Sequence, residues 1–204
     1  LKKSYQLRDL KEVKFKDLWG DHGVFTTMWI FGCPPKILFF NEHIKNLIKS
    51  AKLYKISKST INSDILKLLK INLNTKKNYN HLLRVALNKN TLSISLRKRI
   101  KPSLNFNLKL VNLKRQKPEF KNLKYKKILK YLSKLDNAKS DIALCSNKKI
   151  FETGTSNILF IKDAKVFSPI NKFYKGVTYK FFTSKINRII KNDILVNSLK
   201  EFDE

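Results

Sequence analysis

Three short segments of the chain combine residue types that can do chemistry. The first is LKY at residues 123–125, where a lysine precedes a helical pattern. The second is FETGTSNILF at residues 151–160, in which an acid is followed by small hydroxyl residues and then by a strand pattern. The third is KGVT at residues 175–178, a helix start led by glycine. A helix start presents free backbone N–H groups and a positive dipole end, and is therefore a natural phosphate site.

A lysine, an acid and a phosphate site are together what pyridoxal 5'-phosphate requires. The lysine amine forms a Schiff base and moves protons, and the carboxylate keeps the pyridine nitrogen protonated so that the ring acts as an electron sink. The residues alone leave a plainer alternative open. Any one lysine is a weak signal in a chain this rich in lysine, and Glu152 could simply be the polar end of a strand.

Other common chemistries find little support in the sequence. The three histidines, His22, His43 and His81, have no paired metal-ligand spacing, and we interpret each as structural. No G-x-S-x-G, P-loop or G-x-G-x-x-G pattern occurs.

The elements that must position these segments follow from hydrophobic periodicity. In the first part of the chain we expect a hairpin over residues 23–40, a helix from an N-cap at Asn41, a second helix over 63–69, a polar linker over 72–79 and a second hairpin over 81–100. In the rest we expect strands at 105–113, 141–145, 149–152, 157–162, 165–167 and 194–196. Two further helices are expected there, over 123–135 and from about 176 to 191. This order predicts an α+β fold with two domains, a small N-terminal α/β domain over 1–78 and a strand-rich, cofactor-binding domain over 79–204.

The charge admits a second class of function. Lys and Arg number 44 against 15 Asp and Glu, a net charge of +29 that is typical of proteins that bind nucleic acids or anionic membranes. Only six of the cations are arginine, the residue preferred for phosphate and base contacts, and the lysines spread over both predicted domains. We interpret the charge as solvated surface lysines and keep a basic nucleic-acid-binding module as the alternative.

Three features of the sequence bear on where the protein is found. It has no apolar run near the ~20 residues of a membrane span, no signal peptide at its start, and two cysteines without a disulfide or metal pattern. We therefore expect a cytoplasmic protein without a membrane partner.

Four segments, in order, resemble the class IV aminotransferases, the fold-type-IV pyridoxal-phosphate enzymes that include branched-chain and D-amino-acid aminotransferases and 4-amino-4-deoxychorismate lyases. Residues 18–28, LWGDHGVFTTM, resemble the family's "YGDGVFET" opening, and residues 41–51, NEHIKNLIKSA, its "EHLxRLxxSA" helix. Residues 152–160 are similar to its "EGTTSNLFF" segment and residues 176–178 to its "PGITR" turn. The resemblance covers about residues 17–197 and implies the two-domain fold-type-IV architecture, with pyridoxal 5'-phosphate as cofactor.

Carried over position by position, the resemblance implies that Lys124 is the Schiff-base lysine and that Glu152 is the partner of the pyridine nitrogen. The positions that match the cofactor-lining stretch are Thr155, Ser156 and Asn157. The positions that match the phosphate-binding turn are Val177 and Thr178, and the position that matches a substrate-side aromatic residue is Phe25.

The sequence also departs from the family pattern. The arginine of the "RL" helix, a phosphate ligand in the family, is Asn46 here, the glutamate of "FET" is Thr26, and an extra His22 interrupts "GDG". The sequence ends at residue 204, where the family enters its last strands, so we expect a fragment that lacks those strands and part of the catalytic pocket.

The resemblance implies an enzyme that acts on a small amino substrate as a homodimer. Because TSN after Gly154 is more similar to the lyase and D-amino-acid branches than to "AGEN" of branched-chain aminotransferases, we expect elimination of pyruvate from 4-amino-4-deoxychorismate to give 4-aminobenzoate, a step of folate biosynthesis. Transamination of a branched-chain or D-amino acid shares the first steps and is the alternative within the family. A decayed or truncated member that keeps the fold without turnover is a further alternative.

Overall fold

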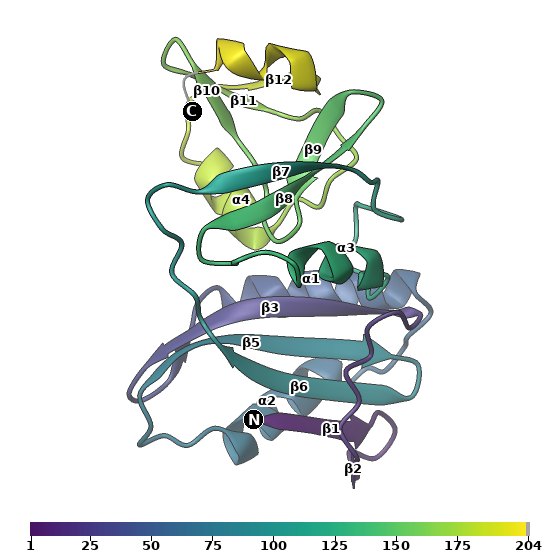
Figure 1. Cartoon of the computed structure of the whole chain (residues 1–204). Coiled ribbons are helices and arrows are strands. Elements are labelled where there is room, and N and C mark those ends of the chain that lie inside the picture. Colours follow the sequence, from purple (N-terminus) through teal and green to yellow (C-terminus); the bar gives the residue numbers. More distant parts are fainter. Residues whose placement is uncertain (203–204) are drawn as a thin grey trace. The chain divides into compact units, whose positions relative to one another are not determined.

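The computed structural model describes residues 1–202 and divides the chain into two compact units. Unit 1 comprises Leu1–Arg99 together with Lys121–Lys124, and unit 2 comprises Ile100–Phe120 and the chain from Tyr125 onward (Figure 1). Each unit mixes helices and strands, which confirms the predicted α+β fold class.

Unit 1 is built on a six-stranded antiparallel sheet with the order β2-β1-β6-β5-β3-β4. Its strands are β1 (Lys2–Gln6), β2 (Glu12–Val13), β3 (Gly23–Gly32), β4 (Lys36–Ile37), β5 (Tyr79–Asn88) and β6 (Thr91–Lys98). The predicted second domain, residues 79–204, includes the hairpin of β5 and β6. In the structure β5 pairs with β3 and β6 with β1, so that this hairpin belongs to the first sheet.

Two helices complete unit 1, α1 (Phe40–Leu53) and α2 (Ile61–Asn72), and α1 contacts both β3 and α2. Buried residues of α1 recur at helical spacing, at Ile44, Leu47 and Ala51, because one stripe of the helix packs inward. The helix begins at Phe40 rather than after an Asn41 cap. Phe39, in the left-handed region with φ 52°, turns the chain out of the β3–β4 hairpin and precedes the first helical residue.

Unit 2 contains a four-stranded sheet with the order β13-β9-β8-β7 and a three-stranded sheet with the order β10-β11-β12. The strands are β7 (Asn107–Asn112), β8 (Ser140–Ser146), β9 (Lys149–Thr153), β10 (Phe160–Lys162), β11 (Lys165–Ser168), β12 (Ile189–Lys191) and β13 (Ile194–Leu195). The helices are α3 (Lys126–Leu132), α4 (Val177–Thr183) and the 3-10 helix η1 (Val196–Glu201). Ile128 and Leu132 of α3 pack on Val111, Ile142 and Leu144 of β7 and β8, forming one core of this unit.

Two predicted helices are shorter than the sequence suggests. The helix expected to run to about residue 191 ends at Thr183, and Ile189 and Ile190 instead pair with β11 as the parallel strand β12. β-branched residues fit a sheet well, and tertiary pairing overrides the local helical pattern here. The helix expected from Leu123 begins only at Lys126, because the backbone of Lys121 and Leu123 is hydrogen-bonded to β3 instead.

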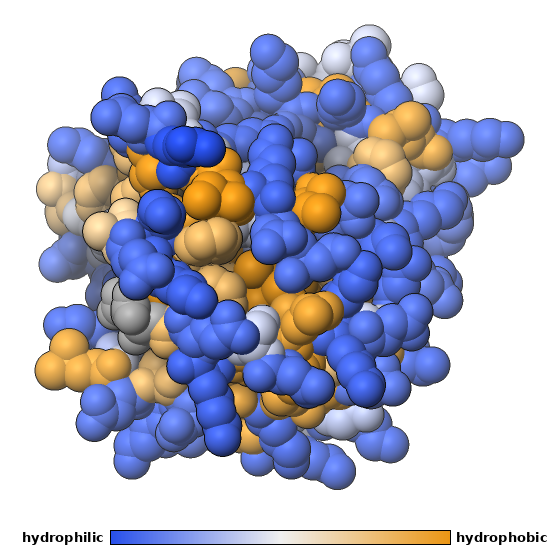
Figure 2. All heavy atoms as spheres, turned by 90° about the horizontal axis from the view of Figure 1, so that it is seen from above, coloured by the Kyte–Doolittle hydropathy of each residue, from blue (hydrophilic) through white to orange (hydrophobic). Residues whose placement is uncertain are grey.

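Hydrophilic side chains cover much of the face seen in Figure 2, and hydrophobic residues form separate patches among them. None of the helices within residues 1–202 combines the length and the apolar character that crossing a membrane requires. Both cysteines are free thiols, Cys33 exposed and Cys145 buried.

Candidate active site

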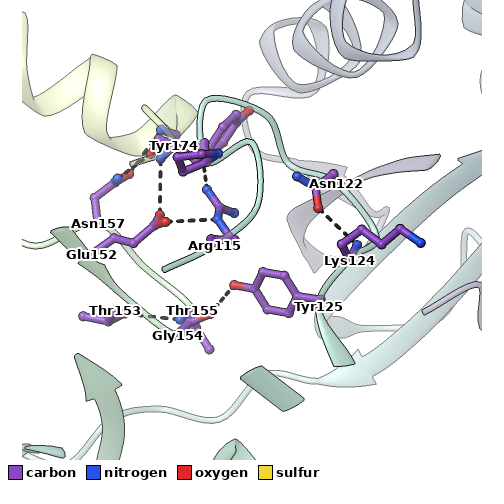
Figure 3. Close-up of polar contacts among 12 residues, drawn as sticks. Arg115, Asn122, Lys124, Tyr125, Glu152, Thr153, Gly154, Thr155, Asn157 and Tyr174 are labelled. Carbon is purple, nitrogen blue, oxygen red and sulfur yellow. Dashed lines mark hydrogen bonds and ion pairs between the residues drawn. The ribbon is translucent and has the colours of Figure 1, made fainter. Parts of the chain in front are cut away.

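Lys124 is the last residue of the short stretch Lys121–Lys124, which belongs to unit 1 although the residues before and after it belong to unit 2. Backbone hydrogen bonds hold this stretch: Leu123 N–H donates to Gly23 O at 2.9 Å, and Gly20 N–H donates to Leu123 O at 2.8 Å. Gly23 is required by the close approach of β5 on one side and of Leu123 on the other, since a Cβ there would lie 2.2 Å from Leu87 O and 2.8 Å from Leu123 Cδ1. The side chain of Lys124 is exposed, and its Nζ donates to Gly20 O at 2.8 Å. Its own backbone N–H donates to Asn122 Oδ1 at 3.1 Å (Figure 3).

Phe25 of β3 lies in the same unit and is buried. Its backbone N–H donates to Lys121 O at 2.9 Å, and its ring packs edge-to-face on Trp19 with centroids 4.7 Å apart. The ammonium of Lys121 lies 5.3 Å from the Phe25 ring centroid, a cation–π distance. The predicted substrate-side aromatic residue thus has an aromatic and a cationic neighbour.

His43 of α1 lies on the other side of β3. Thr26 Oγ1 and His43 Nδ1 are 2.8 Å apart, so that the even-numbered side chains of β3 face α1. Burial, assisted by the nearby positive charge of Lys121, lowers the pKa of His43 to about 4. This histidine is therefore neutral at physiological pH and forms a hydrogen bond between α1 and β3.

Glu152 lies in β9 of unit 2 and is almost fully buried, with 6% of its surface exposed. Its Oε1 is 3.0 Å from Nε of Arg115, whose side chain is also buried. Its Oε2 accepts the backbone N–H of Tyr174 at 3.3 Å (Figure 3). A buried carboxylate is costly unless it is paired, and the guanidinium supplies the pairing charge.

The turn after Glu152 is held by a second buried carboxylate, Asp141 of β8. Asp141 Oδ2 accepts the hydroxyls of Thr153 at 2.9 Å and Thr155 at 2.6 Å, and also the Thr155 N–H at 3.2 Å. Ser156 N–H donates to Thr153 Oγ1 at 2.8 Å. At Gly154 a Cβ would lie 2.7 Å from Asp141 Oδ1, so the turn closes tightly on the carboxylate.

Asn157 connects this turn to the segment before α4. Its side-chain amide donates to Tyr174 O, and its Oδ1 accepts Gly176 N–H at 3.1 Å. α4 then begins at Val177, which is buried, and continues with Thr178, which is exposed. The residue before the helix is Gly176, which has no side chain to cap the first backbone N–H groups.

Six of the predicted residues belong to unit 2, namely Glu152, Thr155, Ser156, Asn157, Val177 and Thr178, and the hydrogen bond between Asn157 and Gly176 joins the turn after Glu152 to the start of α4. Lys124 and Phe25 belong to unit 1, where residues 121–124 run beside β3.

The sequence profile of the amino-transferase class IV family matches residues 23–204. The chain belongs to this family. No curated protein sequence matches it.

Solved structures of two aminotransferases and of a 4-amino-4-deoxychorismate lyase resemble the chain over nearly its whole length. A branched-chain aminotransferase from Thermoproteus uzoniensis has a TM-score of 0.77 at 14% sequence identity, and the alignment covers 99% of this chain and 81% of the aminotransferase. A Brucella abortus aminotransferase bound to the cofactor PLP has a TM-score of 0.74 at 16% identity, with coverages of 100% and 85%. A 4-amino-4-deoxychorismate lyase from Pseudomonas aeruginosa has a TM-score of 0.73 at 13% identity, with coverages of 100% and 86%. At such identities the likeness shows the fold alone.

As a member of this family the chain is an enzyme, and pyridoxal 5'-phosphate is the cofactor of the family. Both predictions, together with the fold-type-IV architecture, are confirmed at this level.

Four residues that shape the surroundings of Glu152 were not among the predicted site residues: Arg115, Tyr125, Asp141 and Tyr174. Tyr125 donates its hydroxyl to Gly154 O, and burial raises the pKa of that hydroxyl above its usual value. Burial likewise raises the pKa of Tyr174. Only Arg115 carried a usable signal, since an arginine is conspicuous in a chain whose cations are almost all lysine.

Proposed function

We propose that Lys124 is the residue to which pyridoxal 5'-phosphate is covalently attached and that Glu152 receives the ring nitrogen. The observation that carries this proposal is the buried, charge-paired Glu152 at the head of the turn formed by residues 153–157. A carboxylate buried beside a guanidinium is suited to accept the N–H of a protonated pyridine ring. The residues present therefore fit the cofactor at the position that decides its chemistry.

The bound cofactor supplies an electron sink for the carbon that bears the substrate's amino group. The chain's own residues supply the remaining functions. The Lys124 amine, on an exposed side chain, takes a proton from the substrate and returns it to the product. Glu152 keeps the ring nitrogen protonated through its negative charge, and Phe25 provides an apolar wall on the substrate side.

Five further residues complete the proposed cofactor site. Thr155, Ser156 and Asn157 line it, in a turn held by Asp141 and Tyr174. Val177 and Thr178 offer backbone N–H groups and a hydroxyl to the phosphate. Asn46, where the family has an arginine, is partly buried in α1 and offers no charge, which predicts weaker phosphate binding than an arginine would give.

We further propose that the reaction is the conversion of 4-amino-4-deoxychorismate to 4-aminobenzoate and pyruvate. The similarity of residues 155–157 to the lyase and D-amino-acid branches supports it. In this reaction the substrate ring carbon that bears the amino group loses a proton, and the bond between the neighbouring ring carbon and the enolpyruvyl oxygen breaks. The released enolpyruvate gains a proton to become pyruvate. Transamination of an amino acid is the competing reaction.

Product analysis separates the two reactions. Purified chain with cofactor is incubated with 4-amino-4-deoxychorismate, and pyruvate and 4-aminobenzoate are quantified. In parallel, D- and branched-chain amino acids are offered with 2-oxoglutarate and glutamate is quantified. Release of pyruvate and 4-aminobenzoate in equal amounts supports the lyase, whereas glutamate formation alone replaces the lyase proposal with transamination.

A trapping experiment tests the lysine. We expect borohydride reduction of the chain with pyridoxal 5'-phosphate to fix the cofactor on the peptide that contains Lys124, and Lys124→Ala to abolish this adduct and activity. Lys127→Ala, which removes an exposed lysine of α3, is the matched control and should leave both unchanged. An adduct that persists undiminished in Lys124→Ala would refute this assignment.

We also propose that the enzyme works in the cytoplasm as a homodimer, as the family resemblance and the two free thiols suggest. Light scattering of the purified chain tests the dimer directly.

A further inference from the structure

Arg115 is the most buried cation near the proposed cofactor site. Only 4% of its side chain is exposed, and the side chain of its partner Glu152 is 8% exposed. The two groups approach to 3.0 Å through Nε and Oε1. Among the described residues 1–202, Nε of Arg115 is a buried side-chain nitrogen that forms no hydrogen bond of good geometry. The attraction between Arg115 and Glu152 is therefore one of opposite charges rather than a directed hydrogen bond.

The chain fixes this guanidinium from other directions. Nη2 donates to the backbone oxygen of Pro118 at 2.6 Å, which folds residues 115–118 into a tight loop. The guanidinium carbon also lies 6.0 Å from the ring centroid of Tyr125. Arg115 is therefore held by its own loop and by an aromatic face, and its position does not depend on Glu152 alone (Figure 3).

The charge balance around Glu152 explains what such an arginine does. A second carboxylate, Asp141, lies in the adjacent strand, and the tyrosines Tyr125 and Tyr174 are uncharged at neutral pH. Burial alone favours the protonated, neutral form of a carboxyl group. An arginine remains charged at any ordinary pH, and an opposite charge at this distance favours the ionised carboxylate.

We propose that Arg115 is a positioning residue that keeps the buried Glu152 carboxylate charged and aimed at the ring nitrogen of the cofactor. The proposal rests on the proposed function, because it acts only through the contact between Glu152 and that nitrogen. A purely structural role for Arg115 would instead weaken all ligands of the site equally.

The test compares two ligands that differ at one atom. Apo chain is titrated with pyridoxal 5'-phosphate and with its 1-deaza analogue, in which the ring nitrogen is replaced by C–H. Both carry the same aldehyde and phosphate, so the ratio of their affinities isolates the ring-nitrogen contact. We expect Glu152→Gln and Arg115→Met each to lower this ratio about tenfold or more, the effect of at least one pKa unit of lost charge pairing.

Three further variants separate positioning from general damage. Arg115→Lys keeps a positive charge and should restore most of the ratio, while the double variant Arg115→Met/Glu152→Gln should fall no lower than Glu152→Gln alone. Arg188→Met removes an exposed arginine of the same unit and should change nothing. If Arg115→Met does not fold, as judged by circular dichroism, Arg115→Gln is used in its place.

The outcomes distinguish the two proposals. A ratio that falls in Glu152→Gln and persists in Arg115→Met overturns the role of Arg115 and leaves that of Glu152 standing. A ratio unaffected by Glu152→Gln overturns the assignment of Glu152, and the role of Arg115 with it. Equal weakening of both ligands in Arg115→Met shows a structural role only.

Discussion

Burial acts differently on the titratable residues of this enzyme, according to the partner that each one finds. Glu152 meets a guanidinium and can stay charged, whereas His43 meets a hydroxyl and a lysine and is held neutral. The hydroxyl of Thr26 satisfies one ring nitrogen of His43 whatever its tautomer. A neutral, hydrogen-bonded histidine between α1 and β3 stabilises the packing of unit 1 as long as it remains unprotonated.

The low pKa of His43 makes the stability of the fold depend on pH. The folded chain holds this pKa at about 4 and the unfolded chain near 6.5, so the unfolded chain binds more protons between these values. Stability is therefore lost as the pH falls from about 6.5 towards 4, by up to about 3 kcal/mol. Urea unfolding followed across this range should show the slope, and His43→Gln should flatten it.

An exposed histidine provides the control for that slope. His22→Gln should leave the pH dependence of the wild-type chain intact. An undiminished slope in His43→Gln would assign the effect to other groups.

The turn over residues 153–157 is an element without regular secondary structure that nevertheless has many internal bonds. Asp141 accepts from the side chains of Thr153 and Thr155, and Asn157 links the turn to the residues before α4. This network orders the polar residues that follow Glu152 before any ligand binds, which lowers the entropic cost of binding.

Removing the carboxylate at the centre of the turn should therefore affect both stability and cofactor binding. In Asp141→Ala the hydroxyl of the buried Thr153 and that of Thr155 lose their acceptor, at a cost of about 1–3 kcal/mol in the free energy of unfolding. We expect weaker binding of pyridoxal 5'-phosphate as well, measured by titration. Asp141→Asn, which retains one acceptor oxygen, should lose less of both.

Asp193 offers the matched comparison, because it is a half-exposed carboxylate of the same unit paired with Lys149. Exposed ion pairs contribute little, so Asp193→Ala should cost less than about 1 kcal/mol. Equal losses in the two alanine variants would show that the turn does not depend on Asp141.

The molecule as a whole carries a net charge of +29, mostly on exposed lysines. Membership in an enzyme family gives this charge no direct role in the chemistry. The like charges repel one another in the compact state, and this repulsion is screened when the Debye length shrinks. The exposed lysines thus destabilise the folded state at low ionic strength.

Added salt should accordingly stabilise the fold. We expect the midpoint of urea unfolding to rise when NaCl is raised from about 0.05 M to about 0.5 M, because the Debye length falls and the repulsion between like charges acts over a much shorter distance. Urea is used because guanidinium would itself add ions, and KCl serves as a second salt. A midpoint that falls in both salts would mean that attractive ion pairs outweigh the repulsion.

Local patterns in the sequence determined much of the fold and part of the candidate site. Strict alternation and turn residues predicted the hairpins of β3–β4 and β5–β6, and the helical stripe predicted α1, because these signals act between neighbours in the chain. The ordered motifs led to the family, to Lys124 and to Glu152. They could not show how far α4 extends or where the β5–β6 hairpin belongs, since strand partners lie far away in sequence.

The surroundings of the candidate residues depend on contacts between distant segments. Arg115 is separated from Glu152 by 37 positions and Asp141 from Thr155 by 14, and no local pattern marks either pair. Backbone pairing with β3 fixed the stretch that carries Lys124, although its residues resemble the start of a helix. Residue types along a chain thus reveal which chemistry is available, whereas burial and charge pairing depend on contacts that form only when distant segments fold together.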